Sequence, residues 1–429
     1  MMYYIAMDIR EDLDWFLSLN KFGTKLGLER IERLLKCLGN PEKSYKIIHV
    51  GGTNGKGSTC TYIGSILKEA GYKTGIYTSP DLGRREERFS VDGEYIKRDE
   101  FLSLIREVRP YAEEINATIF EVETAIALSY FQFKRVDFAI LEVGLGGRLD
   151  ATNVVLPVVS VITNVSKDHT NILGDKIEDI AYEKAGIIKK GVPIVTGCTG
   201  KALSVVERVA SEKGAQVVKR AKYKRISLNK DYQTFLIDNY ILNTRLMGRY
   251  QGENLSVVIA VINCLRDLGY NISDKNILEG VFKSDIKGRM EFIEDNIILD
   301  GAHNVKGIEY LFKSLRDYRY DKLILVIGIL GDKDIDGMIE RMKADLAIIT
   351  RSKNPRSENP KDLSKKFKNI HKDTRLFVME DLKNAIYMAK KIASKRDIIC
   401  ITGSLYLVGE AREILIQRRT KDTLLSING

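Results

Sequence analysis

The stretch IIHVGGTNGKGS occupies residues 47–58 and indicates the fold of the chain around it. Its first residues favour a β-strand, a turn with four glycines follows, and residues 59–69 have the composition of a helix. In such a strand–loop–helix unit, backbone N–H groups curl around phosphate oxygens and the helix N-terminus adds its positive dipole end. Lys56 has the length to reach the outer phosphates, and Ser58 offers a hydroxyl to Mg²⁺. The flanking strand and helix favour a nucleoside triphosphate site over a glycine-rich turn with an incidental lysine.

The composition is typical of a soluble globular protein. The chain has 429 residues, of which 44% are hydrophobic and 29% charged, enough for two or three domains with sizeable cores. No apolar run approaches the ~20 residues of a membrane span, and the acidic N-terminal segment lacks the basic region of a signal peptide. The five cysteines are scattered without a CxxC pair. We therefore expect a reducing cytoplasm and neither a disulfide framework nor a zinc site.

A net charge of +10 raises the question of an anionic partner. Lysines are spread along the whole chain, and no basic run carries interleaved aromatic residues. This distribution favours a lysine-rich surface over a nucleic-acid site. Such a surface would attract polyanionic small molecules.

Strand-like and helix-like runs alternate along the first two thirds of the chain. The expected strands are Tyr45–Val50, Lys73–Thr78, Val136–Val143, Val158–Val165 and Val192–Thr196. Helices are expected within residues 10–40 and over Arg98–Glu114 and Phe120–Phe133. Nearly continuous apolar runs such as VDFAILEV, residues 136–143, are typical of buried parallel strands. The pattern predicts a doubly wound α/β sheet that carries the phosphate loop.

Two further regions complete the expected architecture. Residues 215–247 alternate apolar and polar side chains between Asn-Lys and Asp-Asn turns, which predicts a small antiparallel sheet, and a helix is expected over 251–268. A linker near residues 284–289 leads to a smaller, Rossmann-like α/β series without a phosphate loop. Its expected strands are Asn296–Leu299, Lys322–Ile327, Leu346–Thr350, Thr374–Val378 and Asp397–Thr402. We therefore predict one domain at 1–285 and a second at 286–429.

Three polar side chains follow strands whose carboxyl ends should meet near the phosphate loop. Glu142 ends the apolar run of residues 136–141, and Mg²⁺ prefers such hard oxygen ligands together with phosphate, which favours a metal ligand over a surface ion pair. Ser79 follows the second strand, where a Ser-Pro turn or a helix cap explains it equally well. His169 follows the next strand, and a lone histidine is usually structural or exposed.

The motif TNGKGS, residues 53–58, places Gly57 between the lysine and the serine and resembles the loop of the folylpolyglutamate and dihydrofolate synthases, members of the Mur ligase superfamily. Other Mur ligases have Ser or Thr directly after the lysine. Further motifs match this family in order along nearly the whole chain: TSPDL (78–82), TIFE (118–121), GLGGRLDATN (144–153), NVSKDH (164–169), AYEKAGIIK (181–189), LDGAHN (299–304) and SLYLVGE (404–410). Asp81 and Tyr250 each stand where the family commonly has histidine.

The resemblance implies roles for individual residues. The nucleotide contacts that it implies are Thr53, Asn54, Gly55, Lys56, Gly57, Ser58, Asn254, Arg289, Asp300 and His303. It implies two Mg²⁺ ions, one bound to phosphate and held by Ser58 and Glu142, and one held by Ser79, Glu142 and His169. Lys184 aligns with a lysine that is carbamylated in some relatives, although a lysine on an amphipathic helix is the plainer alternative. Lys56, Glu142, His169 and Lys184 make up the implied catalytic set.

The resemblance also implies a pterin site. Phe120 is a candidate stacking surface for the pterin ring, and Asp150 and Ala151 fall where the family contacts that ring. The remaining histidines, His49 and His371, are expected to be structural and exposed, respectively.

The activity implied is that of an ATP-dependent ligase that adds L-glutamate to the carboxylate of a folate through an acyl phosphate, with or without the same reaction on dihydropteroate. The family's members are usually monomeric, and we expect a monomeric cytoplasmic enzyme with small-molecule substrates and neither nucleic acid nor membrane as a partner. Two alternatives stay open: a Mur-type ligase for another amino-acid acceptor, and a nucleotide-dependent binding protein without ligase activity. Glutamate-dependent ATP turnover separates the binding protein from both ligases.

Overall fold

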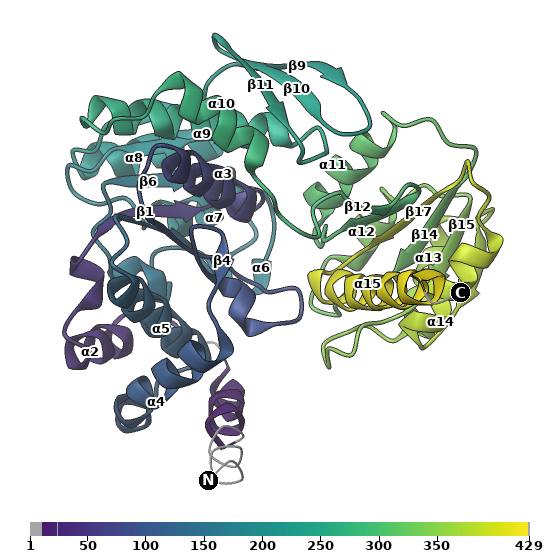
Figure 1. Ribbon diagram of the computed structural model, residues 1–429, viewed down its shortest axis with the longest axis horizontal. Coiled ribbons are helices and arrows are strands. Elements are labelled where there is room, and N and C mark those ends of the chain that lie inside the picture. Colours follow the sequence, from purple (N-terminus) through teal and green to yellow (C-terminus); the bar gives the residue numbers. More distant parts are fainter. Residues whose placement is uncertain (1–10, 24, 428–429) are drawn as a thin grey trace.

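The computed structural model describes residues 11–23 and 25–427, and it contains two α/β units, each built on its own sheet (Figure 1). The first unit carries an eight-stranded sheet with the order β4-β3-β2-β5-β1-β6-β7-β8. Its strands are β1 (Lys46–Gly51), β2 (Thr74–Tyr77), β3 (Phe89–Val91), β4 (Glu94–Tyr95), β5 (Phe138–Glu142), β6 (Val159–Ile162), β7 (Ile194–Thr196) and β8 (Val217–Lys219). Six of them run parallel, and β3 and β4 extend one edge as an antiparallel hairpin that the sequence pattern missed.

Helices cover both faces of this sheet because strands such as β1 and β5 bury side chains on both sides. Helices α2, α4 and α5 pack on the face that includes Ile47 and Leu141, and α3, α9 and α10 pack on the face that includes Ile48 and Ile140. The helical segments with defined bounds are η1 (Leu19–Phe22), α2 (Glu29–Cys37), η2 (Pro41–Lys43), α3 (Lys56–Glu69), η3 (Arg85–Arg88), α4 (Arg98–Ile115), α5 (Ile119–Lys134), η4 (Ala151–Val154), α6 (Thr170–Leu173), α7 (Ile177–Ala185), α8 (Gly200–Glu212), α9 (Gln251–Asp267) and α10 (Asp274–Lys283). The doubly wound prediction is confirmed.

A small antiparallel sheet, order β11-β10-β9, is attached to the first unit as expected (Figure 1). It consists of β9 (Tyr223–Leu228), β10 (Gln233–Ile237) and β11 (Tyr240–Thr244). The small antiparallel sheet begins later than residue 215, where it was expected. Strand β8 still pairs in parallel with β7 at the edge of the main sheet. Because β8 is only three residues long, it shows too little periodicity to be assigned from sequence.

The second unit is a six-stranded sheet with the order β12-β13-β17-β14-β15-β16. Its strands are β12 (Glu291–Glu294), β13 (Ile297–Asp300), β14 (Leu323–Ile327), β15 (Leu346–Ile349), β16 (Arg375–Val378) and β17 (Ile398–Thr402). Its helices are α11 (Val305–Leu315), α12 (Ile335–Ile339), α13 (Pro360–Ile370), α14 (Leu382–Ile392) and α15 (Leu405–Ile427). The five expected strands are present, and β12 adds an antiparallel edge. The domain boundary at 285/286 stays a prediction, which falls between the end of α10 and the start of β12.

One loop of the first unit inserts into the second. Leu82, between β2 and η3, packs with the hydrophobic cluster of β13, β17, α14 and α15. A Cβ added to Gly409 on α15 would lie 1.5 Å from the carbonyl oxygen of Leu82. The absence of a side chain at Gly409 therefore lets the two units meet at this point.

Gly409→Ala is expected to push the Leu82 loop off helix α15. Because the added methyl group would clash with backbone, the free energy of unfolding should fall by about 1–3 kcal/mol. The thermal midpoint and the rate of ATP turnover should both fall as a result. Glu413→Ala, an exposed change on the same helix, is the control and should leave both within error. If the two variants had the same thermal midpoint and the same rate of ATP turnover, the Leu82 contact would not be needed for stability or activity.

Two findings bear on the expected class of protein. Within the described part of the chain, no helix combines the length and apolarity needed to cross a membrane. All five cysteines are free thiols, and only Cys37 is exposed.

Candidate active site

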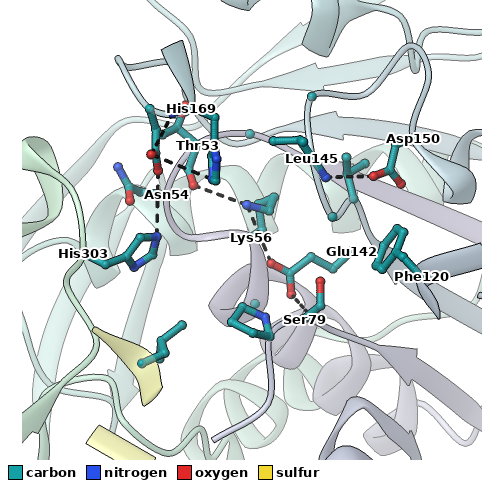
Figure 2. A pocket seen from close by; sticks show the side chains of 18 of the residues that line it. Thr53, Asn54, Lys56, Ser79, Phe120, Glu142, Leu145, Asp150, His169 and His303 are labelled. Carbon is teal, nitrogen blue, oxygen red and sulfur yellow. Dashed lines mark hydrogen bonds and ion pairs between the residues drawn. The ribbon is translucent and has the colours of Figure 1, made fainter. Parts of the chain in front are cut away.

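A cavity of about 920 Å³ lies between the two units and is lined by every residue to which the sequence assigned a catalytic, nucleotide, metal or pterin role. Glu142 is the last residue of β5, and the segments that follow β1 and β6 supply Lys56 and His169. The second unit supplies Asp300 and His303. Figure 2 shows Lys56, Glu142, His169 and His303 around this space. Because the strand order reverses around β1, a crevice opens at this edge of the sheet. The tertiary structure therefore brings the candidate residues together, although their roles stay predictions.

The phosphate loop is held in place by the segment that follows β6. Asn164 Oδ1 accepts from the Asn54 N–H at 3.0 Å, and the hydroxyl of Thr53 accepts from the Ser166 N–H at 3.0 Å. Gly55 has a φ of +82°, and a Cβ there would lie 2.2 Å from Oδ1 of Asn254 on α9. Only glycine fits this position, so the loop backbone and Asn254 lie in close contact.

Lys56, Glu142 and Ser79 form the centre of the cavity (Figure 2). Nζ of Lys56 lies 3.8 Å from Oε1 of Glu142 and donates to the Thr53 carbonyl at 3.3 Å. The Ser79 N–H donates to Oε2 of Glu142 at 3.3 Å. Burial raises the pKa of Glu142, while Lys56 and Arg289 oppose that rise. A further cation beside this buried carboxylate would favour its ionised form.

These oxygen donors fit a divalent cation that shares ligands with a phosphate. Ser58 and Glu142 are both buried beside the loop, and carboxylate and hydroxyl oxygens are the ligands that Mg²⁺ prefers. Among residues 11–23 and 25–427, no three or more His, Cys, Asp or Glu side chains form a group that could hold a metal by themselves. The predicted ligands include only Glu142 and His169 from those residue types, so a metal here would depend on hydroxyls and on phosphate oxygens as well.

His169 belongs to a polar cluster between the units that sequence reasoning found only in part. Asp168 accepts from Lys333 at 2.7 Å and from Asn304 at 3.0 Å, and Asn304 also donates to Asn54 of the phosphate loop at 3.0 Å. Nε2 of His169 lies 3.4 Å from Nζ of Lys333. Burial would raise the pKa of Asp168, but Lys333 and the two neighbouring histidines hold it well below its usual range. Asp168, Asn304 and Lys333 therefore tie the loop to the second unit.

Lys184 on α7 is buried behind the loop and donates to the Gly52 carbonyl at 2.9 Å. Burial, together with the nearby charge of Lys56, lowers the pKa of Lys184 to about 7. A substantial fraction of this amine is therefore neutral and nucleophilic at physiological pH.

The candidate pterin residues line another wall of the cavity. The Phe120 ring stacks on that of Tyr77 with centroids 6.2 Å apart, and a Cβ on Gly144 would meet the Phe120 ring at 2.4 Å. Asp150 is buried, and its Oδ2 accepts from the Leu145 N–H at 2.8 Å (Figure 2). Burial raises the pKa of Asp150 against the hydrogen bonds from Thr152 and Leu145. An aromatic face and a carboxylate thus flank the same space.

The second unit contributes Asp300 from the end of β13. Its Oδ2 accepts from the Tyr250 hydroxyl at 3.0 Å and from the Met290 N–H at 2.9 Å, and its Oδ1 accepts from the Ala302 N–H at 2.9 Å. Tyr250, which stands where the resembling family commonly has histidine, therefore makes a direct contact between the units. Arg289 lies beside this group, with its guanidinium 3.5 Å from the Gly301 carbonyl.

His303 predicts a dependence of stability on pH. Burial, reinforced by Lys333, lowers the pKa of His303 to about 4. Between pH 6.5 and pH 4 the unfolded chain binds a proton that the native chain does not, so stability should fall as pH falls through this window. Denaturant titrations would measure the free energy of unfolding at pH 7 and at pH 5. Its decrease between these pH values should be about 2 kcal/mol smaller for His303→Gln than for the wild type. An equal loss in the two proteins would contradict the assignment of a neutral native His303.

Comparisons with known proteins match this geometry. A model of the Mur ligase middle domain matches residues 50–262, and a model of the Mur ligase glutamate ligase domain matches residues 288–405. The dihydrofolate synthase/folylpolyglutamate synthase of Bacillus subtilis is 36% identical, with 94% of this chain and 97% of the relative covered.

Solved structures are similar over nearly their full length. A Mycobacterium tuberculosis folylpolyglutamate synthase complexed with ADP and AMPPCP has a TM-score of 0.87 at 30% identity, with 95% of this chain and 99% of that chain covered. A bifunctional folylpolyglutamate synthase/dihydrofolate synthase with Mn, AMPPNP and L-glutamate bound has a TM-score of 0.83 at 30% identity, with 94% and 98% covered.

Proposed function

This chain belongs to the Mur ligase family, among the folylpolyglutamate and dihydrofolate synthases, and on that premise we propose which acceptors it uses and which side chains perform the reaction. It is an ATP-dependent ligase that adds L-glutamate to the carboxylate of a folate. We propose that it also accepts dihydropteroate and is therefore bifunctional, as the B. subtilis relative is by name. The observation that carries the assignment is the single cavity that joins the phosphate loop, the Phe120–Asp150 wall and the Asp300–His303 motif.

The reaction proceeds in two steps. The carboxylate of the acceptor attacks the γ-phosphorus of ATP, the bond to the β,γ-bridging oxygen breaks, and ADP and an acyl phosphate form. The amine of glutamate then attacks the acyl carbon, loses a proton, and the phosphate leaves as the amide forms. Phosphoryl transfer needs positioning and charge neutralisation more than covalent catalysis, and Lys56 and Arg289 supply positive charge on two sides of the cavity.

Divalent metal ions, when bound, neutralise the phosphate charge and orient the transferred group. We assign Ser58 and Glu142 to the first metal position, and Ser79, Glu142 and His169 to the second. The position of Glu142 supports this assignment, because its carboxylate lies between Lys56 of the phosphate loop, at 3.8 Å, and the backbone N–H of Ser79, at 3.3 Å. For Lys184, the low pKa supports carbamylation, since a neutral amine is the form that reacts with carbon dioxide.

The remaining residues bind the two larger substrates. Thr53, Asn54, Gly55, Gly57, Asn254, Asp300 and His303 are assigned to the nucleotide, and Phe120, Asp150 and Ala151 to the pterin ring. Their positions around the cavity support this division, since the nucleotide residues lie on the loop, α9 and the second unit, whereas the pterin residues lie on α5 and at the start of η4. We further propose a monomeric cytoplasmic enzyme without a nucleic-acid partner. The five free thiols support the cytoplasmic part of this proposal, because thiols stay reduced in that compartment.

The test is ADP release by the purified protein with MgATP and L-glutamate, using dihydropteroate and tetrahydrofolate in separate reactions. Turnover with both acceptors is expected and would establish the bifunctional synthase. Turnover with tetrahydrofolate alone would reduce the proposal to a dedicated polyglutamylating enzyme. Turnover with neither acceptor would overturn the folate assignment in favour of another Mur-type acceptor.

A further inference from the structure

His49 is a buried polar residue that the mechanism does not use. It lies on β1, is fully buried, and pairs in register with Leu141 on β5 and Ser160 on β6. Its Nε2 lies 2.8 Å from the hydroxyl oxygen of Thr152, whereas its Nδ1 is buried without a hydrogen-bond partner among the described residues. A buried imidazole with an unsatisfied nitrogen costs stability, so an apolar side chain would suit this strand better unless the Nε2 contact matters.

The contact leads directly to Asp150. The Thr152 hydroxyl lies 2.5 Å from Oδ1 of Asp150, and the Thr152 N–H donates to the same oxygen at 3.0 Å. The other oxygen accepts from the Leu145 N–H at 2.8 Å. All three partners are donors, which is the arrangement that an ionised carboxylate requires.

The direction of each hydrogen bond follows from this arrangement. Because the Thr152 hydroxyl gives its only proton to Asp150, it must accept from His49, which therefore carries its proton on Nε2. Burial lowers the pKa of His49 to about 3, so the imidazole stays neutral and keeps this donor role across the physiological range. A fixed chain of donors thus runs from the centre of the sheet to the cavity wall.

We infer that His49 is a positioning residue for the acceptor substrate, acting through Thr152 to hold the Asp150 carboxylate in one orientation toward the cavity. The inference rests on the proposed role of Asp150 in the pterin site. A carboxylate with its other acceptor sites filled presents its remaining lone pairs in a fixed direction, which suits a heterocycle with N–H donors. Within the described part of the chain, the hydrogen bond of the His49 side chain goes to Thr152 and to none of the residues assigned to the nucleotide, so its loss should act mainly on the acceptor.

The experiment measures the KM for tetrahydrofolate and the KM for MgATP in the full-length protein, together with the thermal midpoint. His49→Leu and Thr152→Val are each expected to raise the KM for tetrahydrofolate about tenfold and leave that for MgATP within about twofold. His49→Gln, whose amide nitrogen replaces Nε2 as a donor, should recover most of the loss. Thr152→Val keeps the shape of the side chain, so it still tests the proposal if His49→Leu does not fold.

Two control variants make the outcomes distinguishable. Ser160→Ala removes a buried hydroxyl opposite His49 in register, whose bond goes to the Ile187 carbonyl instead of Asp150, so it should lower the thermal midpoint without moving either KM. Asp150→Asn should raise the KM for tetrahydrofolate; if it does not, the proposed pterin role of Asp150 fails. If Asp150→Asn raises that KM while the His49 and Thr152 variants change neither KM, or change both equally, the positioning role of His49 is overturned.

Discussion

Replacing Lys56 with methionine is expected to lower the kcat for ADP release by about a thousandfold. Nζ of Lys56 is the cation at the start of α3 that faces the cavity, and it lies 3.8 Å from Glu142 and 3.3 Å from the Thr53 carbonyl. Charge develops on the transferred phosphoryl group and the bridging oxygen in the transition state, and no other side chain of the loop carries a positive charge there. Steady-state assays with saturating acceptor and glutamate would measure the effect.

The matched control is Lys68→Met, which removes the same charge from the other end of α3. Lys68 is exposed and donates to the Asp92 carbonyl, away from the cavity. We expect its kcat to stay within about twofold of the wild-type value. A Lys56→Met enzyme that kept a tenth or more of its activity would refute the assignment of Lys56 to the phosphoryl-transfer step.

Glu142→Gln is expected to lower kcat by about a hundredfold and to raise the Mg²⁺ concentration for half-maximal activity by about tenfold. The change keeps the size and shape of the side chain but removes its charge and replaces one acceptor oxygen with an amide donor, which weakens the affinity of this position for a divalent metal. Glu142 is buried and burial raises its pKa, so a metal ion bound beside it would also favour the ionised carboxylate. Activity measured against Mg²⁺ concentration separates this effect from a loss of folded protein.

Two comparisons test that interpretation of Glu142. Glu69→Gln, at the end of α3, removes a carboxylate paired with Lys283 and should leave the Mg²⁺ dependence unchanged. Lys56→Met should lower kcat with a much smaller shift in the Mg²⁺ requirement than Glu142→Gln shows. If Glu142→Gln reduced kcat with the wild-type Mg²⁺ dependence, Glu142 would not be a metal ligand.

Much of the architecture was predictable because its signals are local. Val136–Val143 predicted a buried parallel strand, and β5 occupies residues 138–142 of that run with every residue buried. The sequence pattern missed β3, β4, β8 and β12, since strands of two to four residues are too short to show a clear periodicity. The family and its ATP-dependent ligation of glutamate to folate were also predicted correctly, from motifs in a fixed order.

The phosphate loop and the fold around it were predictable from sequence, because a strand, a glycine turn and a helix N-terminus lie within a few residues of one another. Which distant side chains share the cavity depends on how the two units pack. Asp168 and Lys333 are 165 positions apart, yet they pair at 2.7 Å because the second unit packs against the carboxyl edge of the first sheet. His49, which the sequence placed as a structural residue, is linked to Asp150 through Thr152 because η4 lies against the sheet beside β1. Contacts of this kind leave no signal in the local sequence, because they depend on how segments far apart in the chain pack against one another.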